Sequence, residues 1–264
     1  MALLARQMTL ATILERNARL HADRTALVCG EKAVTFSALD CRAMRLARTF
    51  DAMGVKRGTR VALLMRNCHR FVEILFSLCS LGAVLVPLNW RLTPPELLYV
   101  VKDSDSMVLV YGGEFEETAR TLQAGLDAGV TALDAAQLED GATGESVGEA
   151  ARRAPVCDSD VAVQMYTAAF GGRPRGAQIT HGGYVASAAN LAMALSLTDA
   201  DCSLVVLPLF HTFALEVTVA TLARAGKCVL AEQFETERAA ESIEAERVSI
   251  LPCAGQQLAE LARE

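Results

Sequence analysis

The stretch RVALLMRNCHRFVEILFSLCSLGAVLVPLNWRLTPPELLYVVKDSDSMVLVY, residues 60–111, alternates short apolar runs with segments of helical character. The apolar runs at 60–65, 83–88 and 107–111 are continuous, whereas a half-exposed strand would alternate apolar with polar residues. Continuous runs are typical of strands that are buried on both faces. The order of strands and helices therefore predicts an α/β fold of layered, largely parallel sheets flanked by helices.

Two boundaries inside this stretch decide how it is divided. The run at 71–88 is nearly all apolar, but Gly82 is a helix-stop signal, so we predict a buried helix and a short buried strand and no membrane span. Further along, Thr93 is followed by Pro94 and, three residues after the cap, by Glu96. This combination of a capping box and a proline in the first turn predicts a helix start at residue 94.

Composition limits the setting in which the protein works. The chain has 264 residues, of which 52% are apolar, and a net charge of -6, so no basic surface for nucleic acid is expected. Its eight cysteines include no CxxC pair, which favours free thiols in a reducing compartment and a cytoplasmic location over a disulfide or metal site. Residues 1–20 have apolar residues at helical spacing and no signal-peptide pattern, so they predict an amphipathic helix.

The chain divides into two segments of alternating structure around a polar connection. Residues 1–131 form the first predicted α/β unit. Residues 132–160 are polar and small, and we predict a surface connection without a function of its own. Residues 161–264 form the second unit, which begins with a strand at 161–166, a glycine-rich turn and a helix from about His181.

The turn reads YTAAFGGRPRGAQITH, residues 166–181. Backbone N–H groups of a glycine-rich turn can converge on an oxyanion, and the small residues allow close approach. The spacing fits neither the P-loop nor the dinucleotide-binding pattern. From chemistry alone, a phosphate loop and a plain surface turn are therefore equal alternatives.

Resemblance favours the phosphate loop. The turn resembles the signature YTSGTTGxPKGVxxTH of the adenylate-forming superfamily, residues 35–110 look like the first part of an acyl-CoA synthetase, and LPLFHTFAL (207–215) looks like that family's PLFHxxG segment. The resemblance implies the N-terminal part of an AMP-dependent synthetase/ligase of the acyl-CoA synthetase or fatty-acid–CoA ligase type. It also implies ATP and Mg²⁺ as cofactors and a carboxylic acid and CoA as substrates.

In that family the loop wraps the triphosphate of ATP. The resemblance places the loop at Thr167, Ala168, Ala169, Phe170, Gly171, Gly172, Arg173, Pro174, Arg175 and Gly176. The family's Ser-Gly-Thr-Thr-Gly is replaced at 168–172, which removes three hydroxyls and introduces the Phe170 ring. Thr167 keeps a hydroxyl, and Arg175 preserves the charge of the family's lysine. These departures predict a degenerate nucleotide site.

The family's later motifs, which contact adenine, ribose and Mg²⁺ and supply a catalytic lysine on a C-terminal domain, have no counterpart in the 264 residues. We therefore expect the chain to be inactive alone and to contain no metal site of its own. A non-catalytic acyl- or protein-binding module and one half of a split acyl-adenylating enzyme are the alternatives. An apolar face left uncovered would favour a homodimer or a complementing chain.

For several other residues that match positions of the family, the sequence leaves more than one role possible. In the family, the histidine that matches His211 lies near the acyl pocket and the adenylate, so His211 is a candidate pocket residue, with a structural role as the alternative. We expect His181 to belong to the helix start, and Trp90 and Arg91 to form a strand-to-helix turn. Glu216, on an otherwise apolar helix, is expected either in the substrate cavity or on the surface.

Overall fold

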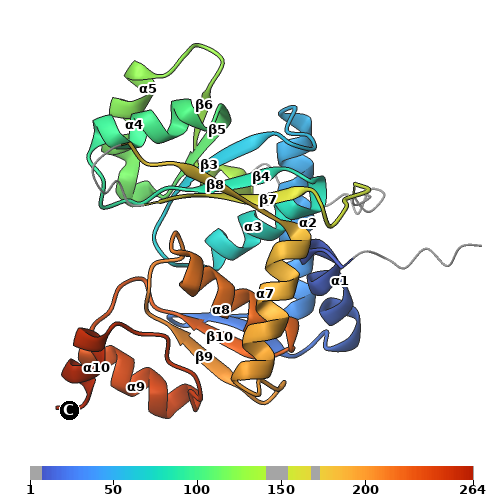
Figure 1. Cartoon of the computed structure of the whole chain (residues 1–264), viewed down its shortest axis with the longest axis vertical. Coiled ribbons are helices and arrows are strands. Elements are labelled where there is room, and N and C mark those ends of the chain that lie inside the picture. The colour runs from blue at the N-terminus through green and yellow to red at the C-terminus, as the bar shows by residue number, and fades with distance from the viewer. Residues whose placement is uncertain (1–7, 141–153, 168–172, 264) are drawn as a thin grey trace, which may run out of the picture.

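The computed structural model describes residues 8–140, 154–167 and 173–263, and within these the chain forms an α/β fold with two sheets (Figure 1). The strands are β1 (Thr25–Cys29), β2 (Lys32–Thr35), β3 (Arg60–Leu64), β4 (Val84–Pro87), β5 (Ser106–Tyr111), β6 (Thr131–Asp134), β7 (Val161–Tyr166), β8 (Gly176–Thr180), β9 (Cys202–Val205) and β10 (Lys227–Leu230). The helices are α1 (Leu10–Leu20), α2 (Phe36–Ala52), α3 (His69–Leu81), α4 (Pro94–Asp103), the 3-10 turn η1 (Gly113–Phe115), α5 (Glu116–Gly125), α6 (Gln137–Asp140), α7 (His181–Ala194), α8 (Thr212–Ala223), α9 (Thr236–Glu246) and α10 (Gly255–Leu261).

The two sheets are largely parallel, as predicted. The larger sheet has the order β6-β5-β3-β4-β7-β8, and the smaller one has the order β2-β1-β10-β9. Among the strand pairs of the described residues, only β7–β8 and β1–β2 are antiparallel. Strands from early and late parts of the sequence mix in both sheets, so the sheets do not follow the division of the chain at residues 131 and 161.

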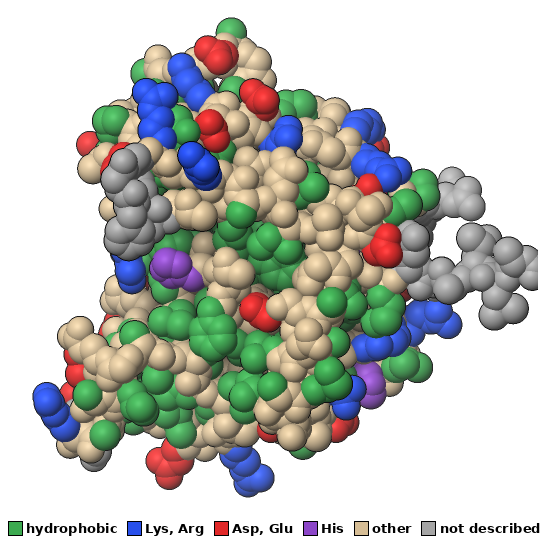
Figure 2. All heavy atoms as spheres, viewed as in Figure 1, with side chains coloured by type: hydrophobic (Ala, Val, Ile, Leu, Met, Phe, Trp, Pro, Cys, Tyr) green, Lys and Arg blue, Asp and Glu red, His purple; other side chains and the backbone are tan. Residues whose placement is uncertain are grey.

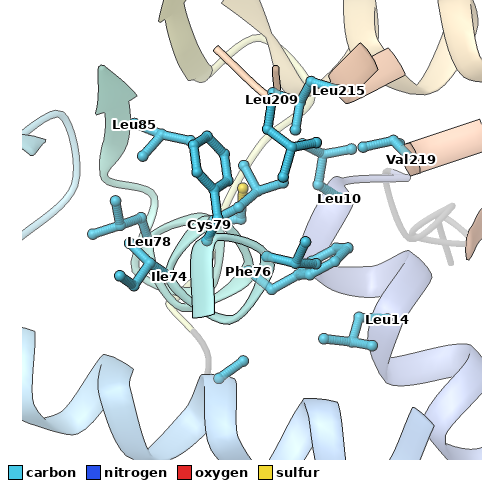
Figure 3. Close-up of a cluster of buried hydrophobic side chains, with 14 of the residues drawn as sticks. Leu10, Leu14, Ile74, Phe76, Leu78, Cys79, Leu85, Leu209, Leu215 and Val219 are labelled. Atoms are coloured by element: carbon cyan, nitrogen blue, oxygen red, sulfur yellow. The ribbon is translucent and has the colours of Figure 1, made fainter. Parts of the chain in front are cut away.

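Helices separate and cover the sheets in five layers (Figure 1). Helices α1, α2, α3, α7 and α8 lie between the sheets, α4 and α5 cover the outer face of the larger sheet, and α9 and α10 cover that of the smaller sheet. In Figure 3, apolar side chains of α1, α3 and α8 meet in the middle layer, among them Leu10, Phe76 and Leu215. Each buried side chain of this size stabilises the fold by roughly 1.5–3 kcal/mol.

Helix α3 is the central element of the middle layer. Its residues from Phe71 to Ser80 are all buried, and Gly82 ends it in the left-handed conformation with φ 69°. Strand β4 follows directly, which confirms the prediction of a buried helix and a buried strand for 71–88. In the described part of the chain, no helix combines the length and apolar character needed to cross a membrane.

The start of α4 also agrees with the prediction. The Glu96 carboxylate accepts hydrogen bonds from the Thr93 backbone N–H at 2.8 Å and from the Thr93 hydroxyl at 2.6 Å. These two bonds lower the pKa of Glu96. The helix therefore begins where its capping residues require, and its buried side Leu97, Val100 and Val101 packs on the larger sheet.

Three elements differ from the sequence-based expectations. The structure adds β8 between the glycine-rich turn and α7, where we expected the turn to lead into the helix. The segment predicted as a polar connection contains part of β6 and the short helix α6. The first helix begins at Leu10 after a Thr9 cap, and residues 1–7 of the predicted helix lie outside the described residues.

Candidate functional site

The glycine-rich turn joins β7 to β8 in an antiparallel hairpin. Its two arms are closed by Thr167 N–H donating to the Arg175 carbonyl at 3.0 Å and by Arg175 N–H donating to the Thr167 hydroxyl at 3.3 Å. The single hydroxyl that the sequence retains is therefore engaged by the hairpin itself. The predicted loop residues 168–172 lie outside the described residues.

The described arm of the loop carries two cationic side chains. Arg173 and Arg175 are exposed, and the Arg173 guanidinium lies over the Tyr99 ring at 5.4 Å from its centroid. At the end of this arm, a Cβ on Gly176 would lie 2.5 Å from the Gln164 amide nitrogen, so a larger residue there would displace the Gln164 side chain. Because the chain as a whole is acidic, an anion here would be attracted by these two local guanidinium groups and not by the net charge of the protein.

The segment that contains His211 follows β9 and is held against the larger sheet by Asn67. The buried Asn67 amide donates to the Leu207 carbonyl at 2.9 Å, and its oxygen accepts from Leu209 N–H at 2.8 Å. His211 is then the N-cap residue of α8, and its ring lies 4.6 Å from that of Phe210. Asn67 thus links the ends of β3 and β9.

The His211 ring is open to solvent on one side and packed on the other. Partial desolvation, together with the nearby charge of Arg91, lowers its pKa. A neutral imidazole at pH 7 can accept or donate a hydrogen bond. Among the described residues, no group is placed to exchange a proton with this ring, and its pocket-lining role stays a prediction.

Trp90 and two arginines lie beside this segment. The Arg66 and Arg91 guanidiniums lie 5.2 Å and 5.0 Å from the Trp90 ring centroid, and the Phe210 ring meets Trp90 edge-on at 5.8 Å. Trp90 follows β4, an interior strand, so besides forming the expected turn it packs against two cationic side chains at the carboxyl end of the larger sheet.

The strands of both sheets end toward this region. Arg66 follows β3, and its guanidinium donates to the Gln233 side chain beyond β10 at 3.0 Å. A cavity of about 310 Å³ opens at these strand ends. Its lining includes Arg66, Asn67, His69, Glu114, Asp134 and Glu232. In open α/β sheets, ligands bind outside the carboxyl ends of the strands, which is the location of this cavity.

The remaining candidates occupy structural positions. His181 is fully buried as the first residue of α7, as expected for a helix-start residue. Glu216 is half-buried and accepts a hydrogen bond from the Ser187 hydroxyl, so it lies at the contact of α8 with α7. It is therefore neither a freely exposed residue nor part of the strand-end cavity. Within the described ranges, no group of three His, Cys, Asp or Glu side chains is arranged to hold a metal.

Comparisons with known proteins agree with this geometry. Residues 14–264 match the model of the AMP-binding enzyme family. The chain is 37% identical over 239 residues to a feruloyl-CoA synthase from Amycolatopsis sp, covering 89% of this chain and 46% of the relative. The chain thus spans about half the length of the curated relatives that it matches.

Solved structures extend the likeness to the fold. The N-terminal domain of FACL13 from Mycobacterium tuberculosis superposes with a TM-score of 0.91 at 27% identity, over 98% of this chain and 66% of that one. O-succinylbenzoate coenzyme A synthetase (MenE) from Bacillus subtilis, solved with ATP and magnesium ion, superposes with a TM-score of 0.84 at 28% identity. The match covers 96% of this chain and 51% of that one. With a family match across nearly all of its sequence, the chain belongs to the AMP-binding enzyme family.

Proposed function

We propose that this chain carries the N-terminal part of an AMP-forming carboxylate–CoA ligase of the acyl-CoA synthetase type, and that its phosphate loop binds nucleotide weakly. The observation that supports the assignment is the hairpin closure between Thr167 and Arg175, which places the retained hydroxyl and the Arg175 backbone at the base of the glycine-rich turn. The weak binding is inferred from the sequence, in which three hydroxyls of the family signature are replaced. The proposed substrates are a carboxylic acid, including fatty acids, and CoA.

The reaction of such a ligase has two stages. The carboxylate oxygen attacks the α-phosphorus of ATP, which gives an acyl-adenylate and releases pyrophosphate. The CoA thiol then attacks the acyl carbon, which gives the thioester and releases AMP. ATP would supply the adenylyl group, and Mg²⁺ would neutralise phosphate charge when bound.

Residues of this chain would contribute mainly electrostatic and positioning effects. Arg173 and Arg175 would hold the phosphate oxygens, since guanidinium pairs well with phosphate. His211, with its lowered pKa, would line the acyl pocket as a neutral ring. The loss of three neutral hydrogen bonds, at about 0.5–1.5 kcal/mol each, would weaken ATP binding by roughly one to three decades.

Two alternatives accompany this proposal: a non-catalytic acyl- or protein-binding module, and one half of a split acyl-adenylating enzyme. The replaced loop residues favour the binding module over an active ligase. Hydrophobic side chains gather across the middle of the face in Figure 2, and Met193, Leu195 and Phe213 are exposed, so a homodimer or a complementing chain would cover apolar surface.

Exchange of radiolabelled pyrophosphate into ATP tests the proposal. The purified 264-residue chain, supplied with a panel of aromatic and aliphatic carboxylic acids, is expected to give no acid-dependent exchange. A ligase of full length from the same family is the positive control. Acid-dependent exchange by this chain alone would overturn the expected inactivity, and tight ATP binding in calorimetry would overturn the degenerate site.

A further inference from the structure

Two tyrosine hydroxyls share the carboxylate of Asp103, the last residue of α4. Tyr166, at the end of β7, donates to one carboxylate oxygen at 2.7 Å, and Tyr99, on α4, donates to the other at 3.1 Å. Tyr166 directly precedes Thr167, where the glycine-rich turn begins. The shared carboxylate therefore ties α4 to the incoming arm of the turn.

The incoming arm is also fixed from the interior. The Gln164 amide, 5% exposed, donates to the Tyr166 hydroxyl at 3.1 Å, and its oxygen accepts from Arg60 at 3.2 Å and Gln178 at 3.3 Å. Since Tyr166 accepts from Gln164, its own hydrogen is directed to Asp103. Desolvation and Asp103 raise the pKa of Tyr166, so the phenol remains a donor at neutral pH.

The outgoing arm is held by Tyr99. Its hydroxyl hydrogen is shared between Asp103 and the Pro174 carbonyl, the latter at 3.3 Å. Its ring lies under the Arg173 guanidinium. Desolvation is the main cause that raises the pKa of Tyr99, and Asp103 adds to it. One side chain of α4 therefore contacts both the backbone and the cation of the arm.

We propose that Tyr99 and Asp103 are positioning residues for the phosphate loop. They hold the two described arms of the hairpin at a set spacing, and Tyr99 holds the Arg173 guanidinium on the outgoing arm. Ordering the arm in advance reduces the entropy that anion binding must overcome. This inference rests on the proposed function, because it assigns these contacts to phosphate binding.

Trypsin tests the positioning without any ligand. The Arg175–Gly176 bond is the cleavable bond of the arm, since Arg173 is followed by proline. Replacement of Tyr99 by Leu, or Asp103 by Asn, should increase cleavage at this bond about 3- to 10-fold, because each removes an interaction of ordinary hydrogen-bond strength. The matched control is Tyr111→Phe, a phenol of the same apolar cluster, which should cleave like the unmodified protein.

Rescue separates positioning from a general loss of packing. Tyr99→Phe keeps the ring under Arg173 and loses the contact with Pro174, so its cleavage rate should lie between those of the unmodified protein and Tyr99→Leu. Melting temperatures of all variants, measured in parallel, should stay within the range of the Tyr111→Phe control. Cleavage of Tyr99→Leu at the control rate would overturn the proposal, as would a gain in cleavage that Tyr99→Phe does not reduce.

Titration with inorganic tripolyphosphate, followed by NMR at the Thr167 and Arg175 amides, tests the link to phosphate. Tyr99→Leu should bind tripolyphosphate about 3- to 10-fold more weakly than the unmodified protein does. The affinity of Tyr99→Phe should lie between those two. Equal affinities would overturn the inference. If the unmodified protein and all variants bind no tripolyphosphate, the phosphate role in the proposed function fails, and with it the assignment of these contacts to phosphate binding. Proteolysis would then report on hairpin geometry alone.

Discussion

Acid should destabilise the protein through one buried histidine, His181. The imidazole is 0% exposed at the start of α7, and its Nδ1 accepts a hydrogen bond from the Leu10 backbone N–H at 3.4 Å. Desolvation lowers its pKa from 6.5 to about 4, although the charge of Asp160 acts in the opposite direction. Folding therefore requires the neutral ring.

The direction of the pH effect follows from proton binding. Between about pH 6.5 and 4 the unfolded chain binds a proton at His181 and the folded chain does not, so the free energy of unfolding falls as the pH falls. A lowering of about 2.5 pKa units, at 1.36 kcal/mol each, corresponds to about 3 kcal/mol lost once the pH reaches 4. Above pH 7 this contribution is fully present.

Urea unfolding at pH 7.5, 6.0, 5.0 and 4.5 measures the effect. His181→Gln keeps an acceptor for Leu10 N–H without a titratable ring. On acidification, the free energy of unfolding of the unmodified protein should therefore fall by about 2–3 kcal/mol relative to that of this variant. His21→Gln, the same substitution at the end of α1, should follow the unmodified protein. Asp160 and its partner Arg57, 2.5 Å apart, are present in every variant, so the comparison measures His181 together with its interaction with Asp160. A pH-independent difference would refute the reasoning.

Three further substitutions probe the fold and the loop. Asn67→Ala should cost about 1–3 kcal/mol in urea unfolding, because the buried Leu209 N–H loses its partner. Gly82→Ala should cost at least about 1–2 kcal/mol, since φ is 69° and its Cβ would lie 3.2 Å from an arginine side chain, whereas Gly129→Ala, with nothing within 4 Å, should be nearly neutral. Phe170→Thr should strengthen tripolyphosphate binding in calorimetry if the ring blocks the loop, and unchanged binding would attribute the weakness to the missing hydroxyls.

The sheets and their helices were predictable where strands are buried on both faces. Residues of β3 and β4 form continuous apolar runs because helices cover both sides of the larger sheet. Strand β8 was missed because its residues are exposed or half-exposed at the sheet edge. Strand β6 lies at the other edge of the same sheet, and its residues are also exposed or half-exposed, so its sequence lacks a continuous apolar run. Edge strands are specified by backbone pairing, which leaves a weak pattern in the sequence.

The partners within the candidate site were less predictable than the loop itself. The bonds of Tyr166 with Asp103, Tyr99 with Pro174 and Leu209 with Asn67 join residues 63, 75 and 142 positions apart. Periodicity within a helix or strand carries no information on such pairs. The one available signal was the position of Asn67 after a buried strand, where polar side chains of an α/β fold gather at the strand ends.

The residues that hold the described arms of the hairpin are separate from the replaced residues of the predicted phosphate loop. The hairpin is closed by Thr167 and Arg175, and its arms are held by Tyr99, Asp103 and Tyr166. All of these residues lie outside the substituted stretch 168–172. Under the proposed function, the replacements at 168–172 remove hydroxyls that would act on a ligand, while the contacts of the described arms stay in place. We therefore expect the affinity for nucleotide to decline more than the stability of the fold.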